Sequence, residues 1–266
     1  MAAELTFVGN ATTLLRLGAF TVLTDPNFLH KGQRAYLGYG LWSRRRTDPA
    51  LDIDQLPPLD GVVLSHLHGD HFDRIARHGL ARDLPIATTR HAARRLRRWG
   101  FGGAEGLVPG EDVRWRRGDQ TLRVTAVPGQ HGPAPVHGLM PPTQGSILDL
   151  FEGDRRTLRL YVTGDTLCRP RLREIADRFP DIDAMVVHLG GTKIMGVLLT
   201  MDGRQGADLM QLIGPRLTVP IHYGEYGVMK SPLSDFEREV ADRGLAARVQ
   251  VVGRGETVPL RQSVTA

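Results

Sequence analysis

The sequence contains one cysteine in 266 residues, and this scarcity excludes an internal disulfide framework. Cys168 is therefore expected to be a free structural thiol in a reducing compartment. No apolar run approaches the roughly 20 residues that a membrane helix needs. The first ten residues, MAAELTFVGN, also lack the basic start and apolar stretch of a signal peptide. Together these absences predict a cytoplasmic protein.

What the chain does have is the composition of an ordinary globular protein, with 41% hydrophobic and 24% charged residues. A chain of this length buries about three quarters of its unfolded surface, so its core needs no cross-links. The net charge of +5 is modest, but arginines cluster in HAARRLRRWG, residues 91–100. Such a cluster is either the solvated face of a helix or a contact for a polyanion. We expect the solvated face, and no nucleic-acid partner.

Short segments rich in β-branched residues and punctuated by glycine predict strands along the whole chain. Antiparallel-looking strands come first and an alternation of strands and helices follows. This order favours an α/β sandwich, two packed mixed sheets with helices outside, in a single domain over residues 1–266. The predicted strands are 4–9, 12–18, 20–25, 61–66, 84–88, 112–117, 120–128, 146–150, 157–163, 183–188, 217–222 and 247–252, and the predicted helices are 91–99, 170–178, 203–213 and 232–243.

A cluster of histidines, SHLHGDH at residues 65–71, stands at the end of the predicted buried strand GVVLSH. In an extended segment, residues two apart point to the same side, so His66 and His68 can hold one ion. The turn that follows brings Asp70 and His71 towards a second position. Neutral imidazole and carboxylate are ligands for Zn²⁺, and also for Mn²⁺ or Fe²⁺.

Three further candidate ligands stand just after, or at the end of, other predicted strands. They are His131 in VPGQHGP, Asp165 in YVTGDT and His222 in VPIHYGE. Polar residues placed where strands end converge on one edge of the sheets, where such folds build their sites. Two ions a few ångströms apart need a shared ligand, and a carboxylate can bridge them because it has two oxygens.

With these residues in place, the sequence resembles the metallo-β-lactamase superfamily. HLHGDH matches the H-x-H-x-D-H motif of that superfamily without a gap, and the resemblance covers nearly the whole chain. It implies an αββα sandwich with a dinuclear metal site at one edge. It also implies two ligand sets that share one aspartate: His66, His68, His131 and Asp165 for one ion, and Asp70, His71, Asp165 and His222 for the other.

The resemblance extends to a branch of the superfamily. The aspartate at position 165 is similar to that of hydrolases with a bridging carboxylate. The true β-lactamases use other ligands there or none, which disfavours antibiotic hydrolysis. LTDPNF and PIHYGEY resemble the branch of ascorbate-phosphate lactonases and of the phospholipase D that acts on N-acyl phosphatidylethanolamine. Overall, the chain is similar to members known only as metal-dependent hydrolases, which implies a fold and a metal chemistry but no substrate.

Four residues are candidates for supporting the ligands or lining the pocket. Asp25 precedes a proline, and we expect it to accept a hydrogen bond from a ligand histidine, with plain turn chemistry as the alternative. Asp202 is either a helix N-cap or a second such partner. His188 ends a predicted strand as a core or pocket-wall histidine, and Tyr223 follows the candidate ligand His222 near the mouth.

The function expected from this site is metal-dependent hydrolysis by a metal-bridging hydroxide. Two divalent cations that share a water lower its pKa from about 16 to about 7 and stabilise charge in the transition state. Zinc is the first choice for both ions, with manganese or iron as alternatives. Asp70 is the expected catalytic residue, because its second oxygen can face the bridging position and orient the hydroxide. The expected substrate is a phosphodiester, as a small or lipid-derived molecule.

Alternatives to this function remain open. The same hydroxide could cleave a lactone or a carboxylic ester, and a protein of another class would be a non-catalytic metal-binding scaffold or regulator. A nuclease is disfavoured, because 266 residues leave no room for the extra domain of the nuclease branches. The long segment 26–58, with its aromatic residues and Arg44–Arg46, either forms a wall of the pocket or simply covers the sandwich edge. Nothing in the sequence sets the oligomeric state.

Overall fold

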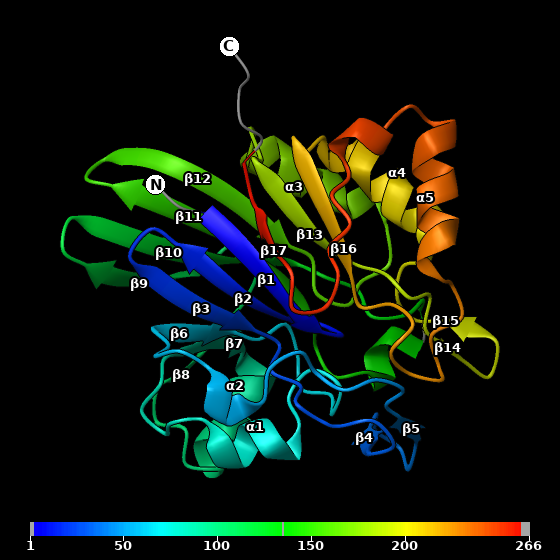
Figure 1. Ribbon diagram of the computed structural model, residues 1–266, viewed down its shortest axis with the longest axis horizontal. Helices are drawn as coiled ribbons and strands as arrows, with labels where there is room; N and C mark the ends of the chain where they lie inside the picture. The colour runs from blue at the N-terminus through cyan, green and yellow to red at the C-terminus, as the bar shows by residue number, and fades with distance from the viewer. Residues whose placement is uncertain (1–2, 135, 262–266) are drawn as a thin grey trace.

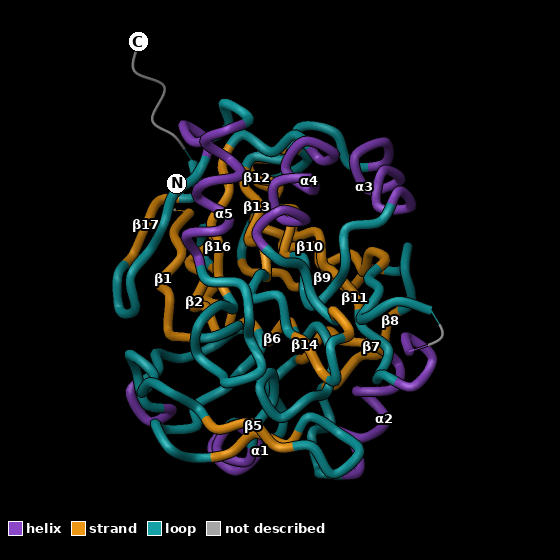
Figure 2. Tube along the Cα trace, turned by 90° about the vertical axis from the view of Figure 1, so that its right-hand side faces the viewer, coloured by secondary structure: helices purple, strands orange, loops and turns teal. Residues whose placement is uncertain are grey.

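A computed structural model describes residues 3–134 and 136–261 of the chain. Two large β-sheets pack face to face, and helices cover both outer faces (Figure 1). The helices lie at opposite ends of the view in Figure 2, with the sheets between them. They are α1 (Arg74–Gly79) and α2 (Arg90–Arg98) on one side, and α3 (Arg173–Arg178), α4 (Gly203–Ile213) and α5 (Leu233–Asp242) on the other. This arrangement confirms the predicted αββα sandwich. The predicted single domain spans residues 1–266, of which residues 1–2, 135 and 262–266 lie outside the described residues.

The first sheet has seven strands in the order β17-β1-β2-β3-β6-β7-β8. Its pairs are antiparallel from β17 to β3 and parallel from β3 to β8. The strands are β1 (Ala3–Gly9), β2 (Thr12–Leu17), β3 (Phe20–Thr24), β6 (Gly61–Val63), β7 (Ile86–Thr89), β8 (Ala104–Leu107) and β17 (Thr257–Pro259).

The second sheet has six strands in the order β16-β13-β12-β11-β10-β9. It is antiparallel from β9 to β12 and parallel from β12 to β16. Because β16 lies at the edge of this sheet, it tolerates Pro220, which has no N–H to donate. The strands are β9 (Asp112–Arg117), β10 (Gln120–Pro128), β11 (Gln144–Glu152), β12 (Arg155–Val162), β13 (Ala184–His188) and β16 (Leu217–Ile221).

Alternation along the strands builds a core of three apolar layers. In β12, Leu160 points between the two sheets, whereas Tyr161 points towards the helices α3, α4 and α5. In β13, Val186 and Met185 divide in the same way. A third layer, which includes Leu96 of α2, fills the space between the first sheet and its two helices. Successive side chains of a strand face opposite sides, so one strand serves two layers.

Two parts of the predicted secondary structure differ from the fold. The last predicted strand, 247–252, is wrong: the chain forms a 3-10 turn at Ala246–Arg248 and one isolated bridge between Thr218 and Val249. A turn then leads to β17 in the other sheet, with the amide of Gly255 bonded to the carbonyl of Phe7 at 2.8 Å. The helix α1 and the strand β8 carry too few residues for a periodic pattern, and the sequence did not predict them.

The long segment 26–58 is ordered and holds a small hairpin of β4 (Arg34–Tyr36) and β5 (Trp42–Arg44) and a 3-10 turn at Ile53–Gln55. A second hairpin, β14 (Lys193–Ile194) and β15 (Val197–Leu198), lies along the same end of the molecule (Figure 1). The first hairpin is anchored by the buried Arg45, whose guanidinium lies 3.1 Å from a carboxylate oxygen of Glu225. Every helix among the described residues is too short or too polar to span a bilayer.

Candidate metal centre

Seven polar side chains meet at the edge of the sandwich where β6, β10, β12 and β16 end. After β6 a tight turn follows, in which the carbonyl of His68 accepts hydrogen bonds from the amides of His71 and Phe72 at 3.1 and 2.8 Å. This turn returns the ring of His71 to within 3.4 Å of the hydroxyl of Ser65. All seven side chains are buried: His66, His68, Asp70, His71, His131, Asp165 and His222.

Three histidines form a first group. Nε2 of His66 and Nδ1 of His68 are 2.9 Å apart. A ring nitrogen of His131 completes a set whose atoms all lie within 4.8 Å of one another. Asp165 borders this group, with its Oδ2 at 3.9 Å from Nε2 of His131. Residues from β6 and β10, which belong to different sheets, thus converge on one point.

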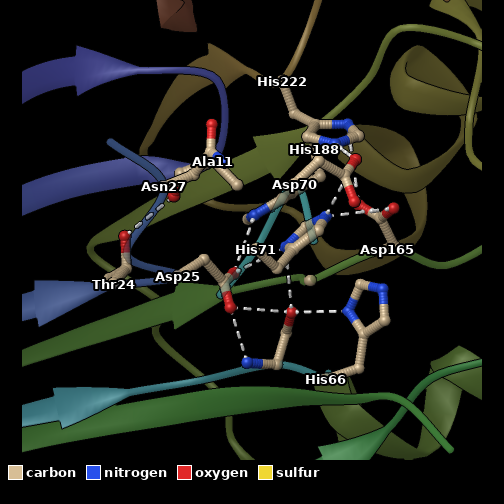
Figure 3. A network of polar contacts seen from close by, with 12 residues as sticks. Ala11, Thr24, Asp25, Asn27, His66, Asp70, His71, Asp165, His188 and His222 are labelled. Carbon is tan, nitrogen blue, oxygen red and sulfur yellow. Dashed lines mark hydrogen bonds and ion pairs between the residues drawn. The ribbon is translucent and has the colours of Figure 1, made fainter. Parts of the chain in front are cut away.

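A second group lies beside the first and contains Asp70, His71 and His222. Oδ2 of Asp70 is 3.9 Å from Nε2 of His71 and 3.5 Å from Nε2 of His222. Asp165 also borders this group, because its Oδ2 lies 3.3 Å from Nε2 of His71. The carboxylate of Asp165 therefore borders both groups, and Figure 3 shows it beside Asp70 and His71.

Several of these buried atoms have no hydrogen-bond partner among the described residues. They include Nε2 of His71 and of His222 and one carboxylate oxygen each of Asp70 and Asp165. A buried polar group without a partner costs free energy, which a bound cation offsets. Imidazole nitrogen and carboxylate oxygen are donors for Zn²⁺, Mn²⁺ and Fe²⁺. The residues present therefore fit divalent metal ions.

The two groups differ in their electrostatics. Burial, followed by the nearby His71, lowers the pKa of His66 well below its ordinary value. Burial also lowers the pKa of His68 to about 3, so both rings are neutral and have a free lone pair. Burial alone would raise the pKa of Asp165, but the imidazoles of His222 and His71 hold it well below its ordinary value. The first group thus offers neutral imidazoles. In the second group burial alone would lower the pKa values of His71 and His222, but the carboxylates of Asp165 and Asp70 raise them, so a bound cation would displace protons there.

Behind the two groups lies Asp25, at the end of β3. Its Oδ1 accepts hydrogen bonds from the amide and hydroxyl of Ser65, at 2.7 and 2.9 Å. Its Oδ2 lies 3.4 Å from Nδ1 of His71 and 3.4 Å from Nε2 of His188 (Figure 3). The backbone of Asp25 has a φ of 35°, a conformation that residues other than glycine rarely adopt. The structure thus places Asp25 where the sequence led us to expect it, against a candidate ligand.

Backbone carbonyls orient two more rings. Nδ1 of His131 donates to the carbonyl of Leu199 at 3.0 Å, which leaves Nε2 free to face the centre. Nδ1 of His222 lies 3.3 Å from the carbonyl of Leu189. Such outer contacts fix the tautomer and the angle of a metal-binding imidazole.

The other predicted supporting residues have different positions. His188 is buried behind the centre, between Asp25 and the hydroxyl of Thr163, and its ring stacks on that of His71 with the centroids 6.0 Å apart. Asp202 caps α4 by accepting from the amide of Gln205 at 2.9 Å. Within residues 3–134 and 136–261, no polar contact joins Asp202, or the half-buried Tyr223, to the seven side chains.

Besides Ser65, two polar residues at the site were missed by the sequence analysis. Nδ2 of Asn10, in the turn after β1, donates to the backbone carbonyl of Asp70 at 2.7 Å. Asp73 caps α1 at the amide of Ala76 and also accepts from the amide of Leu29. Asp73 could have been found as an N-cap before a short helix. Asn10 carries no such signal, because its partner is 60 residues away.

Comparison with known proteins agrees with this geometry. The family model described as beta-lactamase superfamily domain matches residues 21–223. A UPF0173 metal-dependent hydrolase of Deinococcus radiodurans is 27% identical over 256 residues, which cover 95% of this chain and 97% of that protein.

Solved structures are similar over nearly the full length. A possible metal-dependent hydrolase of Veillonella parvula has a TM-score of 0.80 at 22% identity, covering 97% of this chain and 99% of that one. An isothiocyanate hydrolase from Delia radicum gut bacteria has a TM-score of 0.78 at 20% identity, covering 96% and 98%. At such identities the likeness shows a common fold. The narrower likeness to lactonases and phospholipase D stays a prediction.

The match of the family model over most of the chain confirms the resemblance that the histidine motif suggested. Relatives known as metal-dependent hydrolases, and histidine and aspartate groups able to hold metal, point to the same chemistry. The chain belongs to the beta-lactamase superfamily domain family and is a metal-dependent hydrolase of the metallo-β-lactamase superfamily.

Proposed function

We propose that the protein is a dinuclear hydrolase that cleaves a phosphodiester. The observation that supports two ions is the place of Asp165, whose carboxylate borders both groups of ligand atoms. A carboxylate in that position can give one oxygen to each ion. In this proposal the two sites share Asp165: His66, His68 and His131 complete one, and Asp70, His71 and His222 complete the other.

Two divalent cations bound here would lower the pKa of water and polarise the phosphoryl oxygen. The chain itself contributes a proton acceptor. Oδ1 of Asp70 is buried and has no hydrogen-bond partner among the described residues, and Asn10 holds the backbone of Asp70 in place. Asp70 is thus placed to orient the attacking water and to take its proton, while the water oxygen bonds to phosphorus and the ester oxygen leaves.

The charges around the centre support an anionic substrate. Next to His68 opens a cavity whose lining includes Arg34, Arg74, Arg77 and Arg95. A cluster of guanidinium groups attracts and retains anions, and a phosphodiester keeps one negative charge at neutral pH. A neutral ester or lactone would gain nothing from these four arginines.

One observation favours the alternative of a compact neutral substrate, such as a lactone or a carboxylic ester. His68, Asp70, His131 and Asp165 line a small hollow of about 10 Å³, which has room for about one water molecule and would have to widen for a substrate. Its other lining residues are mostly apolar: Leu37, Met140, Thr192, Ile194 and Leu199. The isothiocyanate hydrolase of the same fold acts, by its name, on a small uncharged electrophile, which is compatible with this alternative.

The test is a rate assay on protein loaded separately with Zn²⁺ and with Mn²⁺. Bis(p-nitrophenyl) phosphate represents the phosphodiesters and γ-butyrolactone the lactones. Asp165→Ala serves as the blank, and Asp177→Ala, exposed on α3, is the matched control. We expect phosphodiester turnover that Asp165→Ala abolishes and Asp177→Ala retains.

Turnover of the lactone alone would replace the proposal with its alternative. No turnover of either substrate, with two metal equivalents bound, would leave either a hydrolase of narrower substrate range or the non-catalytic scaffold. A single bound equivalent with full activity would refute the dinuclear site.

A further inference from the structure

A large cavity opens beside the candidate metal centre, between the β4–β5 hairpin and the helices α1 and α2. Its volume is about 530 Å³, the size of a small organic ligand. The hairpin and the two helices lie at the same end of the molecule (Figure 2). Among the lining residues are Tyr36, Trp42, Phe72 and Trp99, together with four arginines.

The ring of His68 forms a wall between this cavity and the metal centre. Nδ1 of His68 points towards His66, whereas the opposite nitrogen, Nε2, lies 3.9 Å from the place that a Cβ on Gly38 would occupy. Both His68 and Gly38 line the large cavity, and His68 also lines the small hollow over Asp165. A molecule reacting at the centre can therefore extend into the large cavity past one side chain.

The cavity carries positive charge that the protein does not neutralise. Within residues 3–134 and 136–261, no carboxylate comes within ion-pair distance of Arg34, Arg74, Arg77 or Arg95, whereas many other arginines of the chain are paired. The one acidic lining residue is Asp73, and its oxygens are occupied by the amides of Phe28, Leu29 and Ala76 and the side chain of Asn27.

The positive charge of the cavity also acts on His91, which is another of its lining residues. Burial, then the charges of Arg94 and Arg95, lower the pKa of its imidazole. Its position adds a neutral hydrogen-bonding group to a wall that is otherwise cationic and aromatic.

Aromatic rings and guanidinium groups lie next to one another in the cavity. The guanidinium carbon of Arg77 lies 4.4 Å from the ring centroid of Trp99, and that of Arg95 lies 5.6 Å from it. On the opposite wall, Tyr36 and Trp42 lie with their centroids 4.9 Å apart, and Trp42 is 58% exposed. Flat apolar faces beside fixed cations are the features that bind a planar anion.

From these observations we propose that the cavity binds the non-reacting part of the substrate, and that this part is an aromatic group carrying its own negative charge. The substrate class is then a phosphodiester with an anionic aryl substituent. The statement about the reacting bond rests on the proposed function, whereas the statement about the cavity rests on its own residues.

The first test measures binding alone, on the Zn²⁺-loaded protein. The anionic dye 8-anilinonaphthalene-1-sulfonate is compared with the neutral dye N-phenyl-1-naphthylamine by fluorescence titration. The test variant is Arg77→Gln with Arg95→Gln. The matched control is Arg94→Gln with Arg98→Gln, which removes two exposed charges from α2 that do not line the cavity.

We expect the test variant to raise the Kd of the anionic dye about tenfold relative to that of the neutral dye, and the control to leave this ratio unchanged. Equal effects of both double variants would mean that net charge alone attracts the dye, and the inference would fail. Wild-type protein that binds both dyes equally would overturn it too.

The second test measures turnover of two diesters with the same p-nitrophenyl leaving group. One carries a methyl group and the other a 4-carboxyphenyl group. We expect the wild type to prefer the carboxyphenyl diester in kcat/KM, and the double variant at Arg77 and Arg95 to lose this preference. A wild type that hydrolyses both diesters without preference would refute the substrate class. If neither diester is hydrolysed while the dye result holds, the proposed function fails and the binding site stands.

Discussion

At the scale of single residues, Asp25 connects the two candidate metal groups to the rest of the fold. One carboxylate reaches Ser65, His71 and His188, and the hydroxyl of Ser65 also lies 3.0 Å from Nδ1 of His66. A substitution of Asp25 is therefore expected to change metal affinity indirectly, through the orientation of the rings of His71 and His66. Asp25 is a positioning residue in the proposed site.

The variant Asp25→Asn tests this role. The amide keeps the shape of the side chain but removes its charge and one acceptor oxygen, so the ring of His71 loses its anionic partner. We expect metal affinity to fall about 10- to 100-fold, as for other outer partners of metal-bound histidines. Competition with a chromogenic chelator measures this, and Asp177→Asn is the control. Unchanged affinity in Asp25→Asn would show that Asp25 serves the turn alone.

Cys168 offers a second test at this scale, by its reaction with iodoacetamide. Burial, followed by the charge of Asp208, raises the pKa of the Cys168 thiol to about 11. Because the thiolate is the reactive form, a raised pKa means slow alkylation at neutral pH and a rate that climbs until about pH 11. A midpoint near 8.5 in the pH–rate profile would contradict this environment.

Single residues also show what the sequence could reveal about the site. The seven candidate ligands were readable because their residue types and their places at strand ends are local properties. Asn10 and Ser65 were not, since each acts through a partner that only the folded chain brings near. Asp202 satisfied two hypotheses equally, and only its geometry shows that it caps a helix.

At the scale of elements, the β4–β5 hairpin is attached directly to the histidine turn. The amide of Gly69 donates to the carbonyl of Tyr36 at 2.9 Å. A Cβ on Gly69 would lie 2.7 Å from the amide nitrogen and 2.8 Å from the carbonyl oxygen of Tyr36, both closer than real contacts allow. The wall of the large cavity thus keeps a fixed place relative to the candidate ligands on either side of Gly69.

Gly69→Ala should separate these two elements. The new methyl group pushes β4 away from the turn, and overpacking of this kind costs about 1–3 kcal/mol of unfolding free energy. We expect a lower Tm and weaker binding of the anionic dye. Gly102→Ala, at a place where a Cβ would meet nothing within 4 Å, is the matched control. Equal Tm values for the two variants would mean that the hairpin adapts without cost.

The elements also show which strands could be predicted from the sequence and which could not. Strands with clear alternation, such as β10 and β12, were located from their pattern. Residues 247–252 have the same β-branched character, yet β16 meets them at one residue pair only. A strand needs a partner as well as a propensity, and the partner is decided by the global topology. The sequence predicts that segment 26–58 either forms a wall of the pocket or covers the sandwich edge, and in the fold residues of its hairpin line the large cavity.

At the scale of the whole molecule, the candidate metal centre lies at an edge where the two sheets meet, and apolar side chains fill most of the space between these sheets. The candidate ligands follow β6 in the first sheet and β10, β12 and β16 in the second. Ions bound there would connect the two halves of the sandwich at one edge. Metal binding is therefore expected to stabilise the fold as well as to supply the chemistry.

Chelation tests this coupling. A ligand at a hundred times its Kd stabilises a protein by about 2.7 kcal/mol, which corresponds to roughly 5–10 °C in Tm for a chain of this size. We expect excess EDTA to lower the Tm of the metal-loaded protein by that amount. The Tm of His131→Ala should respond less, because that variant lacks a candidate ligand. An equal response of both proteins would show that the chelator acts elsewhere.

The buried pair of Arg45 and Glu225 has a consequence for how such enzymes diversify. It fixes the base of the hairpin to a point three residues after His222, while Ala35 and Ser43 face inwards and Tyr36 and Trp42 face outwards. The residues at the outward positions can thus vary in evolution without changing the Arg45–Glu225 pair or the candidate ligands. Replacing the outward-facing residues of this hairpin with those of a paralogue is expected to transfer the substrate preference of that paralogue and to leave the candidate ligands unchanged.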